Sequence, residues 1–207
     1  VDIGGATTDI NSVAEGRPTI GGVNLRGLDE PYVKRTVEGD LGMRYSAASL
    51  VDAVGIADML SFVPEEIGEE ELVRYVDKVS GDIKYIPDNR HKKEIDYGIA
   101  KAATKLAIRR HVGRIETVYG PLGASFVQYG KDLTEVNFLI GTGGVLAHSD
   151  NPGEILKYGT YDGESPEILA PKAPNLMIDR EYILSSIGLL AEIEPALRLA
   201  KKSLQYA

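Results

Sequence analysis

Two apolar strands that each run into a glycine-rich turn constrain this chain more than any other feature. The first strand reaches Asp2-Ile3 and turns at Gly4-Gly5. The second, residues 136–140, turns at Gly141-Thr142-Gly143-Gly144. Glycine has no Cβ, so backbone N–H groups in such turns can approach an anion closely. Both turns are therefore candidate binding sites for an anionic ligand.

The first turn also carries side chains that suit phosphate chemistry. Thr7 and Thr8 offer hydroxyl donors, and the carboxylate of Asp2 suits a hydrated Mg²⁺ or the orientation of an attacking water. The alternative is a plain β-hairpin with an Asp and a Thr at its turn, because glycine occurs in most turns. The eight-residue pattern from Asp2 to Asp9 is more specific than that alternative requires.

The second turn, Gly141 to Gly144, joins a strand to an expected helix, an arrangement that suits an anion or the edge of a nucleotide. Many such turns are glycine-rich for steric reasons alone. No Gly-Lys-Ser/Thr follows, so this is not a Walker A loop. Neither turn completes the Gly-x-Gly-x-x-Gly pattern of a dinucleotide fold.

Strands alternate with helices along the chain, which favours an α/β fold with a mixed sheet flanked by helices. A charged block, residues 61–94, is expected to form a small inserted subdomain or lid within a domain built from 1–60 and 95–207. Hydrophobic spacing and turn signals predict strands at 7–13, 19–23, 115–119 and 136–140. They predict helices at 46–60, 95–112 and 153–158, one or two helices at 183–204, and a charged helical stretch inside 64–98.

Composition excludes several functional classes. A net charge of −8 disfavours nucleic acid and anionic membranes as partners. There are no cysteines, and no apolar run approaches the roughly 20 residues that span a bilayer. We therefore expect a cytoplasmic protein. His91, His111 and His148 are expected at the surface or at helix ends, and the acidic residues 65–71 as a solvated helix start.

Four segments together resemble one known family. The pattern Asp-x-Gly-Gly-x-Thr-x-Asp at residues 2–9 is typical of the second domain of the actin, Hsp70 and sugar-kinase superfamily. The resemblance narrows to the MutL/GlmL family, a different fold from the mismatch-repair protein of the same name. It rests on VDIGGATTD at 1–9, VEGDLGMR at 37–44, GKDLT at 130–134 and IGTGGV at 140–145. Asn11 departs from the pattern, which has His there.

This resemblance implies an actin-like (ribonuclease H-like) ATPase domain, and an accessory or reactivating protein for a coenzyme-B12-dependent mutase of the glutamate mutase type. The implied cofactors are ATP and Mg²⁺. The implied γ-phosphate contacts are Gly4, Gly5 and Thr7, with Thr8 beside them. Asp2 is implied to hold Mg²⁺ through water, which makes Asp2 and Thr7 the catalytic candidates. Gly141, Thr142, Gly143 and Gly144 are implied to flank the adenosine.

The resemblance leaves two roles open. Glu38, Gly39 and Asp40 match a turn that approaches the ribose in related folds, but Asp40 could instead cap the following helix. Lys131 and Asp132 are expected to form a salt-bridged surface turn.

The superfamily's first phosphate hairpin belongs to another domain, and this chain contains no second hairpin of that form. We therefore expect a piece of a longer polypeptide that binds nucleotide weakly by itself. The alternatives are a small-molecule kinase of the same superfamily and an actin-like scaffold without hydrolysis. The sequence does not indicate an oligomeric state.

Overall fold

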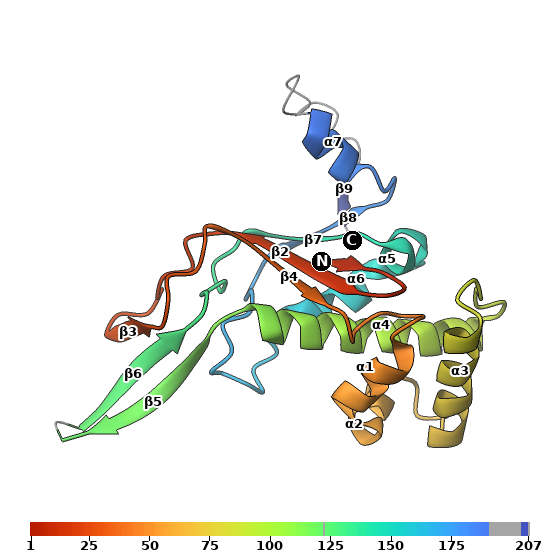
Figure 1. Cartoon of the computed structure of the whole chain (residues 1–207), viewed down its shortest axis with the longest axis horizontal. Helices are drawn as coiled ribbons and strands as arrows, with labels where there is room; N and C mark the ends of the chain where they lie inside the picture. The colour runs from red at the N-terminus through yellow and green to blue at the C-terminus, as the bar shows by residue number, and fades with distance from the viewer. Residues whose placement is uncertain (122, 191–203, 207) are drawn as a thin grey trace.

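A mixed β-sheet forms the centre of the molecule, which confirms the expected α/β class. The computed structural model describes residues 1–121, 123–190 and 204–206. Two three-stranded sheets meet side by side at β1 and β7, so the strand order is β4-β2-β1-β7-β8-β9 (Figure 1). The strands are β1 (Asp2–Ile3), β2 (Thr8–Val13), β4 (Val33–Glu38), β7 (Phe138–Gly141), β8 (Asn175–Asp179) and β9 (Leu204–Tyr206).

Strand direction decides where the two glycine turns lie. β1 pairs with β2 in the antiparallel sense, and β7 pairs with β8 in the parallel sense. A parallel bridge joins β1 to β7: the Ile3 N–H donates to the Thr142 carbonyl at 3.1 Å, and the Thr142 N–H donates to the Val1 carbonyl at 2.8 Å. The carboxyl ends of β1, β7 and β8 therefore meet at one edge of the sheet.

Helix α4 (Arg90–His111) lies along one face of this sheet (Figure 1). The Asn89 side chain caps its first turn by accepting the Lys92 N–H at 2.9 Å, and the positive charges of Arg109 and Arg110 in its last turn suit the helix dipole. Ile99 and Ala103 on its buried face join one hydrophobic cluster with Ile3 and Ile10 of the sheet. This packing confirms the helix expected at 95–112 and extends it by one turn towards the amino end.

Three further helices pack beside α4, namely α1 (Ala47–Val54), α2 (Ile56–Leu60) and α3 (Glu69–Gly81). The single helix expected at 46–60 is wrong, because Gly55 has a φ of 88° and divides it. The three glutamates of the first turn of α3 form the expected acidic helix start. Its buried side chains join the same hydrophobic cluster as α4: Leu72, Tyr75, Val76 and Val79. The division of the chain at 61–94 stays a prediction.

A second sheet projects from the body as an arm (Figure 1). It consists of β3 (Val23–Arg26), β5 (Arg114–Gly120) and β6 (Gly123–Tyr129), with β6 between the other two. The strand expected at 115–119 is confirmed. The strand expected at 19–23 is wrong, since Gly22 has a φ of 80° in a turn and β3 begins only at Val23.

The remaining short helices follow β7 and β8. They are α5 (Gly144–His148), α6 (Pro152–Leu156), the 3₁₀ helix η1 (Lys157–Gly159) and α7 (Leu184–Leu190). The helix expected near 153–158 is confirmed by α6 and η1. Of the one or two helices expected at 183–204, the first part is present as α7, and residues 191–203 lie outside the described residues. Among the described helices, none combines the length and apolarity needed to cross a membrane.

The expected surface turn at Lys131 and Asp132 is wrong. Lys131 is fully buried, and its ammonium donates to the carbonyls of Pro31 and Tyr32 at 3.0 and 2.9 Å. The Asp132 carboxylate accepts the backbone N–H groups of Thr19 and Thr134 at 3.0 and 2.9 Å. Both side chains therefore fasten the segment between β2 and β4 to the chain ahead of β7.

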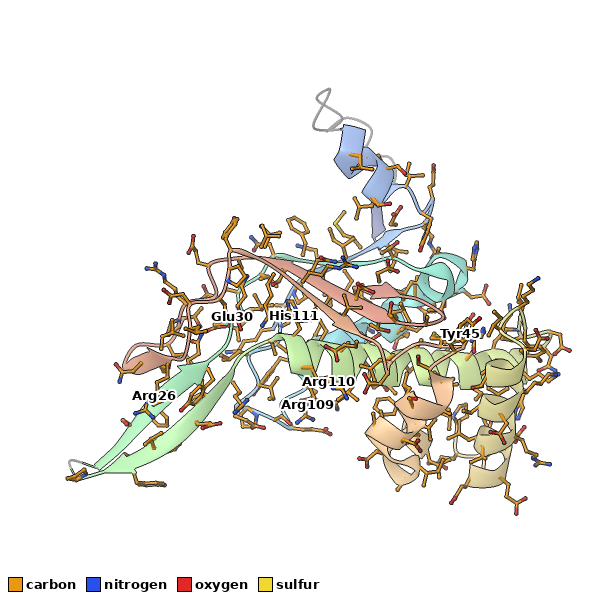
Figure 2. The ribbon with its side chains drawn as sticks, viewed as in Figure 1. Arg26, Glu30, Tyr45, Arg109, Arg110 and His111 are labelled. Carbon is orange, nitrogen blue, oxygen red and sulfur yellow. The ribbon has the colours of Figure 1, made fainter. Side chains whose placement is uncertain are left out.

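His111 is also buried, contrary to the expected surface or capping role. Its Nε2 lies 2.8 Å from the Ser12 hydroxyl, and its Nδ1 lies 2.8 Å from the Thr36 hydroxyl. Figure 2 shows His111 at the carboxyl end of α4, beside Arg109 and Arg110. The ring thus joins α4 to β2 and β4. His148 is exposed, as expected, and His91 lies at the surface with its Nε2 2.8 Å from Glu71.

Candidate functional site

The two glycine turns lie side by side, as their positions after β1 and β7 require. Gly143 has a φ of 104°, and a Cβ there would lie only 2.3 Å from the carbonyl oxygen of Ile3. A Cβ on Gly141 would lie 2.7 Å from the Leu146 side chain. These two glycines therefore serve close packing, while Gly144 faces open space. The structure supports the steric interpretation of Gly141 and Gly143.

The carbonyl groups of the first turn all point towards the segment before α1. The Gly4 carbonyl accepts the Met43 N–H at 3.0 Å, and the Gly5 carbonyl accepts the Arg44 N–H at 2.8 Å. The Ser46 hydroxyl donates to the Ala6 carbonyl at 2.8 Å. Three successive peptide planes are therefore fixed in one orientation.

This orientation turns three backbone N–H groups outward. In a trans peptide the N–H points opposite to the preceding carbonyl, so the N–H groups of Gly5, Ala6 and Thr7 face away from the supporting segment. None of the three has a hydrogen-bond partner among the described residues, and Gly5 and Ala6 are exposed. Successive free N–H groups of this kind form a concave anion-binding site. We call the Gly5, Ala6 and Thr7 amides the amide nest.

The segment from Glu38 to Ser46 is the support of this nest. A Cβ on Gly42 would lie 2.3 Å from the carbonyl carbon of Ala6, so only glycine permits the contact. The Thr8 hydroxyl is fully buried and donates to the Leu41 carbonyl at 2.7 Å. The Thr8 side chain therefore holds the support in place and does not reach the nest, whereas Thr7 lies in the nest itself.

Three carboxylates, those of Asp2, Asp9 and Asp179, lie close to one another at this edge of the sheet, and their environments differ. Asp9 is neutralised by Arg35, whose Nη2 lies 2.7 Å away, and it accepts the Thr7 hydroxyl at 2.9 Å. Asp179, at the end of β8, accepts the backbone N–H groups of residues 183 and 184. Asp2 has no hydrogen-bond or ion-pair partner among the described residues. Burial, followed by the nearby Asp9 carboxylate, raises the pKa of Asp2, so a bound cation would stabilise its ionised form.

The acidic turn at Glu38 and Asp40 forms the start of the support: the Ser46 hydroxyl that donates to the Ala6 carbonyl also donates to the Gly39 carbonyl at 2.7 Å. Arg110 of α4 donates to both carboxylates, with distances of 2.8 Å to Glu38 and 2.7 Å to Asp40, and lowers the pKa of Asp40. The alternative in which Asp40 caps the next helix is wrong, because Ser46 occupies the cap position of α1. Glu38, Gly39 and Asp40 do not line the cavity described next, and their approach to a ribose stays a prediction.

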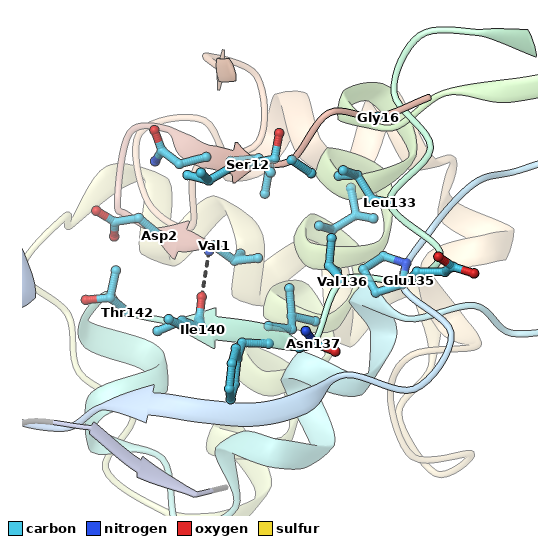
Figure 3. A pocket seen from close by; sticks show the side chains of 18 of the residues that line it. Val1, Asp2, Ser12, Gly16, Leu133, Glu135, Val136, Asn137, Ile140 and Thr142 are labelled. Carbon is cyan, nitrogen blue, oxygen red and sulfur yellow. Dashed lines mark hydrogen bonds between the residues drawn. The ribbon is translucent and has the colours of Figure 1, made fainter. Parts of the chain in front are cut away.

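A cavity of about 930 Å³ opens beside Asp2. Figure 3 shows Asp2 and Thr142 at one end of it and Leu133 and Val136 at the other. Its lining includes apolar side chains of β2 and β7 and one residue of α4, Ile108. Asp179 and Tyr182 also line it, and Tyr182 is exposed with an unusual φ of 55°. Asp2 thus lies at the polar end of the cavity, on the strand that leads into the nest.

Sequence reasoning missed two parts of this site. Ala6 contributes the central N–H of the nest, but an alanine carries no chemical signal in a sequence. Arg44 supplies one of the three donors that orient the nest; it ends the VEGDLGMR segment at 37–44, but the sequence did not indicate this role. The run of glycines and threonines located the turn correctly, while the orientation of its peptides required the structure.

Together the paired turns and the outward amides define a class of α/β protein with free backbone N–H groups at one edge of its sheet. The chain belongs to the MutL protein family, whose model matches residues 1–204, and this confirms the family resemblance. It is 50% identical over 207 residues to Protein MutL of Clostridium tetanomorphum, covering 99% of this chain and 44% of that relative. The chain therefore spans less than half the length of this curated relative. No solved structure matches it.

Proposed function

We propose that this chain is the nucleotide-binding half of an ATP-dependent accessory protein that serves a coenzyme-B12-dependent mutase of the glutamate mutase type. The observation that supports nucleotide binding is the amide nest. Three adjacent N–H groups point outward from a turn whose carbonyl groups are held by hydrogen bonds on the opposite side. Such a nest suits a phosphate group because it offers several donors without moving. The second turn lies beside it, where the adenosine of a bound ATP would follow the phosphates.

The carboxylate of Asp2 suits Mg²⁺ better than its neighbours do. Mg²⁺ keeps several water ligands and binds proteins through one or two carboxylates together with substrate phosphates. Asp9 and Asp179 already accept hydrogen bonds, whereas Asp2 is free among the described residues. A Mg²⁺ held through water at Asp2 would neutralise phosphate charge next to the nest.

The fold expected of such a protein is the actin-like ATPase fold, and two observations support it. Both turns lie at one sheet edge, and β1 is flanked by an antiparallel and a parallel neighbour. The proposed partner, a coenzyme-B12-dependent mutase, is supported by the family membership alone. The accessory role belongs to the full-length protein, in which ATP would be held between two domains.

Calorimetric titration tests the proposal. Mg-ATP and Mg-ADP are titrated into this chain and into the full-length protein. We expect tight binding by the full-length protein and weaker binding by the chain, because half of a two-domain site loses its contacts with the other domain. The mutase and its inactivated form are added next, and release of damaged cofactor should depend on ATP. Absence of nucleotide binding by both proteins would contradict the proposal.

Asp2→Asn in the full-length protein should weaken Mg-ATP binding by roughly tenfold, which corresponds to about 1.4 kcal/mol. Asparagine keeps the size of the side chain and removes the charge that attracts the cation. The affinity for ATP measured with the Mg²⁺ chelated should change little. The measurement is therefore the ratio of the ATP affinities with and without Mg²⁺. Asp150→Asn, at an exposed position away from the turns, is the control. Equal Mg²⁺ dependence in the wild type and Asp2→Asn would contradict the role of Asp2.

A further inference from the structure

One side chain of the nest's support reaches into the helical layer. Arg44 donates its backbone N–H to Gly5, and its Cβ and Cγ lie 3.6 Å from where a Cβ on Gly5 would be. Its guanidinium then turns away and donates to both oxygens of Asp96 on α4, each at 2.9 Å. The residue that orients the Gly5 peptide is thus held by a paired, two-point contact.

Asp96 is in turn held by helix α3. The Tyr75 hydroxyl donates to its Oδ1 at 3.0 Å, and both side chains are about 5% exposed. A buried carboxylate with a bidentate Arg and a Tyr donor has one favourable arrangement, because any displacement leaves a charge unpaired. Four groups therefore form a continuous chain: the nest, Arg44, Asp96 and Tyr75. We call it the Tyr75 relay.

We propose that Arg44 is a positioning residue of the nucleotide site, and that the Tyr75 relay couples helix α3 to the amide nest. Displacement of α3 removes the Tyr75 hydrogen bond to Asp96 and weakens the contact of Asp96 with the guanidinium of Arg44. The peptides that Arg44 orients in the nest then become disordered. The coupling is reciprocal, so phosphate in the nest holds α3 in place. The nucleotide part rests on the function proposed above, whereas the coupling itself concerns only described residues.

The first test needs no ligand. Tyr75→Phe removes one hydroxyl and keeps the ring, so the core stays filled. We expect the backbone amide resonances of Gly5, Ala6 and Thr7 to shift and their hydrogen exchange to become severalfold faster. The matched control is Tyr85→Phe, because the Tyr85 ring packs edge-on against Tyr75 at 6.1 Å and its buried hydroxyl has no hydrogen-bond partner within the described part of the chain. Changes confined to α3 and α4 would overturn the coupling.

The second test measures phosphate recognition. Pyrophosphate, Mg-ATP and adenosine are titrated into the wild type, Tyr75→Phe and Arg44→Lys, in the full-length protein. Lysine keeps the charge of Arg44 but cannot make the two-point contact with Asp96. We expect the dissociation constants of pyrophosphate and Mg-ATP to rise about threefold in Tyr75→Phe and about tenfold in Arg44→Lys, with adenosine affected less than twofold. A merely structural defect would weaken all three ligands together.

The outcomes separate the two proposals. If the wild type binds neither pyrophosphate nor Mg-ATP, the proposed function fails, and the ligand-free exchange measurement still decides whether α3 and the nest are coupled. If the wild type binds both and the variants bind them equally well, the positioning role of Arg44 is overturned while the nucleotide site stands.

Discussion

Replacing Asp96 with alanine should lower the free energy of unfolding by about 3–5 kcal/mol, the usual cost of removing one partner from a buried ion pair. The Arg44 side chain is only 15% exposed, so its guanidinium would be left with a buried, unpaired charge. The Tyr75 hydroxyl would lose its acceptor as well. Urea denaturation of the chain, followed by circular dichroism, gives the difference in free energy.

Asp150→Ala provides the control, because Asp150 pairs with Lys93 at 3.7 Å while its side chain is 83% exposed. Surface pairs of this kind contribute little, and no measurable change is expected. Equal stability of the two variants would mean that Asp96 and Arg44 are not a desolvated pair. Asp96→Asn separates the effect of the charge from that of the side-chain shape. Its free energy of unfolding should lie between those of the alanine variant and the wild type, since the amide oxygen still accepts one hydrogen bond.

The location of the nest could be predicted from the sequence because the information is local. A glycine pair between β-branched strands specifies a turn, and the second glycine turn follows an apolar strand of the same kind. Parallel strands end at the same edge of a sheet, so the proximity of the two turns follows once β1 and β7 are neighbours. The resemblance to the family implied only that both turns bind one nucleotide, and the bridge between Asp2 and Thr142 in the structure makes the two strands neighbours.

The parts that could not be predicted depend on distant partners. Arg44 and Asp96 are separated by 52 residues, and Lys131 and Pro31 by 100. In the sequence Lys131-Asp132 reads as an exposed polar turn, because lysine and aspartate are almost never fully buried without partners. The structure supplies those partners as backbone carbonyls and amides. The burial of polar residues in an irregular segment therefore cannot be predicted before the tertiary contacts are known.

His111 is another residue whose burial the sequence did not indicate. Its burial should cause a loss of stability in mild acid. Its ring is fully buried between two hydroxyl groups. Burial, followed by the positive charges of Lys34 and Lys131, lowers the pKa of His111 from 6.5 to about 4. In the unfolded chain the ring takes up its proton near pH 6.5, whereas the folded protein resists protonation until about pH 4.

The sign of the pH dependence follows directly. Between these two pKa values the unfolded state binds more protons, so the free energy of unfolding falls as the pH is lowered from about 6.5 to about 4. The full loss amounts to about 3 kcal/mol, and about 2 kcal/mol of it should be seen between pH 7 and pH 5. Urea denaturation at these two pH values measures it.

A substitution isolates the contribution of this one ring. His111→Gln keeps a donor and an acceptor between Ser12 and Thr36 but does not titrate, so it should be less stable than the wild type at pH 7 and nearly equal to it at pH 5. His148→Gln, at an exposed position, should keep the wild-type pH dependence. If His111→Gln loses as much stability on acidification as the wild type, the acid sensitivity originates in the carboxylates instead. The hydrogen bonds from α4 to β2 and β4 would then be held by a ring that accepts a proton without penalty.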